Sequence, residues 1–124
     1  MEMRPAHFPG RAPVDAYGDG GFRFAEMSHK GSMLFLPSGI YAWNVSAEKV
    51  LEVDAYDAVF READAIEVLL IGTGADLRPI PARLREVFRE NRISADSMST
   101  GAAVRTFNVL LAEGRAVAAA FLAV

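Results

Sequence analysis

The chain has 124 residues, a length that fits one domain, and its 13 basic and 16 acidic residues give a formal net charge of −3. That balance argues against general binding to nucleic acid, which needs a basic face. Cysteine is absent, so disulfides and thiolate sites are excluded, and the two histidines, His7 and His29, are too far apart in sequence to indicate a metal site. No apolar run approaches the roughly 18 residues that span a bilayer, and we expect a cytoplasmic protein with no direct membrane insertion.

The first half of the chain predicts strands. Residues 1–20 are rich in proline and glycine, as is typical of an arm that packs on a single domain formed by residues 21–124. Residues 22–28 alternate in polarity and precede the apolar residues 33–37, and the glycine-bearing turn between them predicts a β-hairpin. The aromatic and β-branched residues 40–45 predict a third strand.

The second half alternates strands and helices. Residues 53–61 are compatible with either a short helix or an irregular bridge, and the apolar residues 66–71 predict a strand that is covered on both faces. Further strands are predicted at residues 93–96 and at residues 116–124, the last being rich in small apolar residues. This order predicts an α/β domain whose mixed sheet is covered by helices on at least one side.

Two longer helices are predicted from their apolar stripes. Pro81 suits the first turn of one helix, and Ser97, Ser99 or Thr100 can cap the start of the other, which Gly114 ends. The residues expected to face the core are Ile80, Leu84, Val87 and Phe88 in the first helix and Ala103, Phe107, Leu110 and Leu111 in the second.

The strand at residues 66–71 runs into a glycine loop, Gly72-Thr73-Gly74. Glycines let backbone N–H groups approach an anion, and a following helix N-terminus adds positive charge, so the loop could hold a phosphate or another small anion. Neither nucleotide fingerprint is complete, since Leu77 stands where a third glycine is needed and no Lys-Ser/Thr pair completes a P-loop. The alternative is a sharp exit from the strand, with Thr73 hydrogen-bonding locally.

A second constellation lies on the last predicted helix, which Thr100 opens. At helical spacing Arg105 and Asn108 share one face beside small residues, apart from the core stripe. Arginine with asparagine suits a carboxylate, a phosphate or a partner's backbone. Two alternatives stay open: a solvated helix face, or an Arg105 that braces the glycine loop.

Other candidate sites are weaker. The acidic residues Asp54, Asp57, Glu62 and Asp64 are most simply surface charge, and no serine lies on a G-x-S-x-G elbow. We therefore expect no catalytic residue, metal or cofactor, and a non-enzyme is favoured over an enzyme. Strand edges and aromatic residues of the first half could support a homodimer, or these aromatics pack under the arm.

Several residues, taken in order, carry a family resemblance between about residues 14 and 122. They are Gly72-Thr73-Gly74, Thr100, Ala103, Arg105-Thr106, Asn108-Val109-Leu110 and Glu113-Gly114-Arg115. Together they resemble the small Mth938-like family that includes mitochondrial respiratory complex I assembly factor 3. Two positions depart from it: Val104 stands where members often carry cysteine, and Phe107 where many carry tyrosine, so apolar packing is the role that remains.

The resemblance implies both a fold and a function. The fold is a three-layer α/β domain, with a central mixed sheet, helices on one side, and a smaller β layer with a short helix on the other. The implied function is a non-enzymatic assembly module that meets protein partners, subunits of a respiratory or other membrane complex among them. The alternative is a small-ligand or anion-binding protein, or an enzyme, with its pocket between the Gly72–Gly74 loop and the helix of Arg105 and Asn108.

Overall fold

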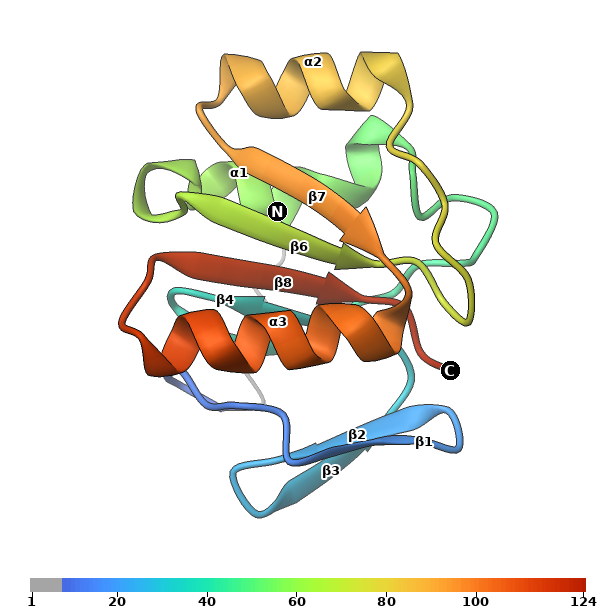
Figure 1. Cartoon of the computed structure of the whole chain (residues 1–124), viewed down its shortest axis with the longest axis vertical. Coiled ribbons are helices and arrows are strands. Elements are labelled where there is room, and N and C mark those ends of the chain that lie inside the picture. Colours follow the sequence, from blue (N-terminus) through green and yellow to red (C-terminus); the bar gives the residue numbers. More distant parts are fainter. Residues whose placement is uncertain (1–7) are drawn as a thin grey trace.

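The computed structural model describes residues 8–124, so residues 1–7 of the predicted arm, with His7, lie outside the described part. This part of the chain folds into two β-sheets and three α-helices (Figure 1). The central sheet contains, in spatial order, β5 (Gly39–Ala42), β4 (Met33–Leu36), β8 (Val117–Phe121), β6 (Val68–Gly72) and β7 (Ser94–Met98). The small sheet contains β1 (Ala16–Gly18), β2 (Gly21–Phe24) and β3 (Met27–Lys30). The helices are α1 (Asp57–Arg61), α2 (Ala82–Glu90) and α3 (Thr100–Ala112), with 3-10 turns at Val53–Tyr56 and Ala63–Ala65.

The central sheet is mixed. β6 pairs in parallel with both β7 and β8, whereas β4 runs antiparallel to β8 and β5. The buried strand predicted at residues 66–71 is β6, and the small-residue strand predicted at residues 116–124 is β8, which lies at the middle of the sheet. The predicted α/β class, with a central mixed sheet and a smaller β layer, is confirmed.

The helices divide between the two faces of the central sheet. α1 and α2 pack on the face that carries Leu69 and Ile71, while α3 shares the opposite face with the small sheet (Figure 1). In this respect the structure differs from the implied arrangement, which placed the helices on one side and the β layer with the short helix on the other. The cause is the strand order β8-β6-β7. The chain moves outward from β6 to β7 and then back across β6 to β8, and right-handed crossovers in opposite directions place their helices on opposite faces.

A hydrophobic cluster fills each side of the central sheet. On the α2 side, the Tyr56 ring lies against Trp43 and Phe88, with centroids 5.5 and 5.2 Å apart. On the α3 side, Phe35 of β4 lies 5.3 Å from Phe107. Each such aromatic contact adds about 0.5–1.5 kcal/mol beyond the burial of its area. Phe107 therefore packs as expected of an apolar residue, and Trp43 packs beside α1 and α2.

The hairpin predicted between residues 22–28 and 33–37 is wrong. The first segment turns back on itself at Ala25 and Glu26 to form β2 and β3, and β4 pairs with β5 and β8 instead. Ala25 and Glu26 have φ values of 47° and 62°, the left-handed conformation of a tight two-residue turn. Neither residue is the glycine or asparagine that normally marks such a turn, so the pattern resembled one continuous strand.

The predicted limits of the longer helices agree with the structure. Pro81 is the N-cap of α2. Ser99, one of the three candidate caps, begins α3 by accepting a hydrogen bond from the Ala102 N–H at 3.4 Å, and Gly114 follows the helix with φ 75°. Between residues 8 and 124, none of the helices has the length and apolar character needed to cross a membrane.

Residues 8–20 of the predicted arm are partly built into the domain. They contribute β1, and Phe8 forms a bridge with Ile40 of β5. The Gly20 N–H donates to the Val124 carbonyl at 2.7 Å, which ties the arm to the C-terminal segment. The arm therefore meets the β5 edge of the central sheet at Ile40.

Candidate functional site

Thr100 joins the glycine loop to the first turn of α3. Its hydroxyl accepts a hydrogen bond from the Gly74 N–H at 3.0 Å and donates one to the Leu122 carbonyl at 2.7 Å, and its own N–H donates to the Gly74 carbonyl at 2.8 Å. The Thr100 side chain is fully buried. One hydroxyl thus connects three segments that follow β6, β7 and β8, and it fixes the start of α3 against the end of the sheet.

The two glycines of the loop are required for different reasons. A Cβ on Gly72 would lie 2.9 Å from the Cα of Thr100, so only glycine lets α3 approach β6 this closely. Gly74 has φ 104°, a backbone conformation that strains a residue with a side chain. These geometries give the Gly-Thr-Gly sequence a structural explanation.

Thr73 bonds within its own loop, as the tight-turn interpretation expects. Its hydroxyl lies 2.8 Å from the Asp76 carbonyl and 3.1 Å from the Met98 carbonyl, and it accepts a hydrogen bond from the Arg78 N–H at 3.0 Å. The Thr73 N–H donates to the Met98 carbonyl at 2.9 Å. The N–H groups of Thr73 and Gly74 are therefore already used inside the protein, whereas a phosphate loop presents such groups to its ligand.

Asn108 lies two helical turns beyond Thr100 and holds the N-terminal arm. Its Oδ1 accepts a hydrogen bond from the Val14 N–H at 2.9 Å, and its Nδ2 donates to the Val14 carbonyl at 2.8 Å. The side-chain amide thus pairs with both polar groups of one backbone residue, as a neighbouring strand would. Asn108 is half-buried by this contact, so the solvated-face alternative does not describe it.

Arg105 lies on the exposed side of α3. Within residues 8–124 its side chain forms no hydrogen bond or ion pair, so it does not brace the glycine loop. On the same side of the helix lies Val109, which is 56% exposed, and the Tyr17 side chain lies over Gly101, where a Cβ would collide with its hydroxyl. We call Tyr17, Arg105 and Val109 the α3 strip.

Two surface cavities lie away from the predicted site residues. One of about 280 Å³ lies on the small sheet and is bordered by Arg23, Ser28 and Lys30 among others. The other, of about 250 Å³, lies between α2 and β7 and is lined by Arg85, Phe88, Arg89, Ile93, Ser94 and Ala95. No local sequence pattern indicates the second cavity; the spacing of four residues between Arg85 and Arg89 indicates only that they share one side of α2.

The titration of Tyr56 is altered by its surroundings. Burial raises the pKa of this phenol well above its usual value, and the nearby positive charge of Arg78 opposes that shift. The Tyr56 hydroxyl donates to the Val50 carbonyl at 2.6 Å. Among residues 8–124, no three histidine or carboxylate side chains gather closely enough to hold a metal ion.

Comparison with known proteins relates the chain to proteins of bacteria and of animals. It is 36% identical to an uncharacterised protein of Rhodobacter capsulatus over 98% of this chain and 93% of that protein. It is 26% identical to NADH dehydrogenase [ubiquinone] 1 alpha subcomplex assembly factor 3 of Mus musculus over 98% of this chain, which spans 66% of that relative's length. The crystal structure of a protein of Bartonella henselae, described as an outer membrane protein, superposes with a TM-score of 0.90 at 61% identity, over 94% of this chain and 98% of that one.

The family resemblance inferred from the glycine loop and from α3 is confirmed by these relationships. The family described as "Protein of unknown function (DUF498/DUF598)" matches residues 14–122, which include both the loop and the whole of α3. The chain belongs to this family.

Proposed function

We propose that the protein is a non-enzymatic interaction module that assists the assembly of a membrane-bound respiratory complex. The observation that carries this proposal is the similarity of nearly the whole chain to relatives named as assembly factors of NADH dehydrogenase. Because the chain spans only part of those relatives, the proposal concerns the role of this domain and not every contact that the longer proteins make. Its partners are protein subunits of the complex or of an assembly intermediate.

The proposal divides the predicted site residues into two roles. Gly72, Thr73, Gly74 and Thr100 fix α3 on the sheet through hydrogen bonds and close backbone packing. Asn108 fixes the arm that carries Tyr17. Arg105 then contacts the partner from a helix whose position is rigidly defined.

The α3 strip has the composition of a protein-binding surface. Tyrosine and arginine are enriched among the residues that contribute most to protein interfaces, because each combines a large contact area with directed hydrogen bonds. In the α3 strip, Arg105 has no partner among residues 8–124, and Val109 exposes apolar area beside it. A partner that covers this strip buries the exposed apolar area of Val109. The Arg105 guanidinium can bind that partner without first breaking a hydrogen bond to another residue from 8 to 124.

The test is affinity purification of the tagged protein from detergent-solubilised lysate of its own organism, with mass spectrometry of the bound proteins. Wild type is compared with Arg105→Glu and with Lys49→Glu, a matched charge reversal at an exposed residue far along the chain from the α3 strip. We expect subunits of the respiratory NADH dehydrogenase with wild type and Lys49→Glu, and their loss with Arg105→Glu. Equal recovery of these subunits with all three proteins would remove the α3 strip from the proposal, and their absence throughout would contradict the proposed function.

A further inference from the structure

β7 is the edge strand of the central sheet that no other described residue pairs with on its outer side. Among residues 8–124, β7 pairs with β6 on one side only, whereas β5 at the far edge is bridged by Phe8 at a single residue, Ile40. An open edge strand presents unpaired N–H and C=O groups to which another extended chain can add. Proteins normally block such edges, so an unblocked edge is a candidate binding surface.

The backbone groups that face outward can be identified from the ladder. The Ser94 N–H donates to the Glu67 carbonyl at 3.0 Å, and the Met98 carbonyl accepts from Thr73, so these alternate positions face β6. By the alternation of a strand, the N–H and C=O groups of Ala95 and Ser97 face away from the sheet. They form the hydrogen-bonding edge that an added strand would use.

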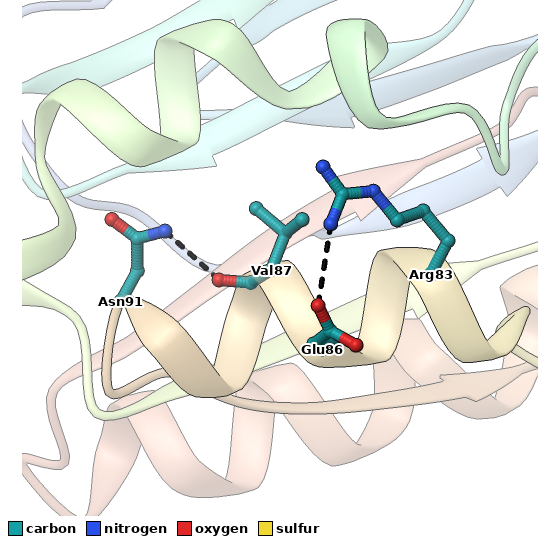
Figure 2. Close-up of polar contacts among 4 residues, drawn as sticks. All are labelled: Arg83, Glu86, Val87 and Asn91. Carbon is teal, nitrogen blue, oxygen red and sulfur yellow. Dashed lines mark hydrogen bonds and ion pairs between the residues drawn. The ribbon is translucent and has the colours of Figure 1, made fainter.

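The cavity of about 250 Å³ runs beside this edge, beneath α2. Arg85 and Arg89 lie on its α2 side and are exposed, and their side chains form no hydrogen bond or ion pair with any residue from 8 to 124. Among the acidic residues of α2, Glu86 pairs with Arg83 at 3.3 Å (Figure 2), and neither Glu86 nor Glu90 forms an ion pair with Arg85 or Arg89. The groove therefore presents two guanidinium groups that have no ion-pair partner among residues 8–124, next to an open strand edge.

We propose that β7 binds an extended acidic segment of a partner protein, which adds to the sheet as a further strand; this rests on the proposed function. Side chains of the added strand alternate between two faces. Those on the face of Ala95 point toward Arg85 and Arg89, and we assign acidic residues to them. Those on the opposite face lie beside the exposed Asp96, which disfavours a second acid there.

Charge selects this occupant over a second copy of the chain. Two copies joined edge to edge through β7 bring the same pair of guanidinium groups from each copy to one seam, and like charges in close contact oppose association. An acidic strand neutralises both groups. The bound segment thus carries carboxylates at alternate positions, with polar or basic residues between them.

The experiment is a selection of random short peptides displayed on their encoding RNA, carried out on the immobilised full chain. We expect enrichment of peptides with acidic residues at positions i and i+2, and about tenfold or greater loss of their affinity for the Arg85→Glu/Arg89→Glu variant. Ala95→Pro removes an outward N–H and should weaken binding of the same peptides. The fold should survive this change, because proline is tolerated at strand edges. Arg83→Glu on the same helix is the matched control and should bind like wild type.

Three results would overturn the proposal. The first is that wild type enriches no peptides beyond those enriched by the Arg85→Glu/Arg89→Glu variant, and the second is that the selected peptides lack acidic residues at alternate positions. The third is that the wild-type chain forms a dimer that the Arg85→Glu/Arg89→Glu variant does not form. Circular dichroism confirms that each variant is folded before binding is compared. The selection does not depend on the identity of the natural partner, so its failure is separate from that of the purification experiment. If the affinity purification recovers respiratory subunits but the selection enriches no peptides, β7 is rejected as a binding edge and the proposed function is unaffected.

Discussion

Thr100 and Gly72 are packed so closely that a single methyl group on Gly72 would lie 2.9 Å from the hydroxyl oxygen of Thr100. That oxygen is also the atom that bonds Gly74 and Leu122. Helix and strand are therefore closely packed at the same point where the Thr100 hydroxyl links the segments after β6 and β8 to the start of α3. It gives the start of α3 a defined position, on which the α3 strip depends.

Removing the Thr100 hydroxyl should destabilise the fold. In Thr100→Val the shape is kept but the Gly74 N–H and the Leu122 carbonyl lose their partner in a buried site, at an expected cost of about 1–3 kcal/mol in the free energy of unfolding. Thr100→Ser keeps the hydroxyl and should lose less. Urea unfolding of the three proteins measures both effects, and equal stability of the valine and serine variants would contradict the role assigned to the hydrogen bonds.

Adding a methyl group at Gly72 should separate α3 from the sheet. Gly72→Ala forces Thr100 or the backbone of β6 to move, which typically costs about 1–3 kcal/mol in an overpacked core. Gly10→Ala is the control, because a Cβ at that position would lie at an ordinary 3.6 Å from Phe8. Thermal unfolding should show a lower midpoint for Gly72→Ala only, and a midpoint equal to that of the control would show that the site can relax.

Asn108 and Arg105, although they lie on the same helix, should respond differently to truncation. Asn108→Ala removes both hydrogen bonds to Val14, and we expect a loss of about 1–2 kcal/mol together with faster amide exchange in the arm. Arg105→Ala removes an exposed side chain and should change stability by less than about 0.5 kcal/mol. Chemical unfolding with hydrogen exchange tests the pair; a large destabilisation by Arg105→Ala would assign that residue to the scaffold.

Tyr56 makes the stability depend on alkaline pH. Its pKa is raised in the folded state by burial, so the folded protein holds the phenol proton when the unfolded chain, with a pKa of about 10, has lost it. The stabilisation is complete below about pH 10 and is lost progressively as the pH rises beyond that value. Urea titrations on both sides of this pH should show that the free energy of unfolding declines less steeply with pH in Tyr56→Phe than in wild type. Equal declines in the two proteins would contradict the role assigned to Tyr56.

Much of the fold could be predicted from apolar periodicity and from the residues that begin and end helices. Apolar runs mark the strands β6 and β8, and apolar stripes mark the helices α2 and α3. Pro81 and Ser99 mark the starts of the two helices, and Gly114 marks the end of α3. The β2–β3 turn was missed because Ala25 and Glu26 adopt left-handed conformations without a glycine or asparagine to signal them. The faces of the helices followed from strand order, which no local pattern records.

The site could be predicted less well, because its contacts join distant residues. Asn108 and Val14 are 94 positions apart, and nothing in the sequence of either segment specifies the other. The Gly72–Gly74 loop was located correctly at the exit of a buried strand, and the tight-turn alternative agrees with the bonds of Thr73. The groove at β7 depends on which strand ends the sheet, so it emerged only from the three-dimensional arrangement.

The measurement that tests the central claim most directly is site-specific photo-crosslinking in living cells of the source organism. A photoreactive amino acid replaces Val109 on the α3 strip in one strain and the exposed Glu48 in another. We predict adducts between position 109 and subunits of the respiratory NADH dehydrogenase or its assembly intermediates, and none of these from position 48. Adducts of those subunits from position 48 alone, or from neither position while the protein is expressed and folded, would contradict an assembly role exerted through α3.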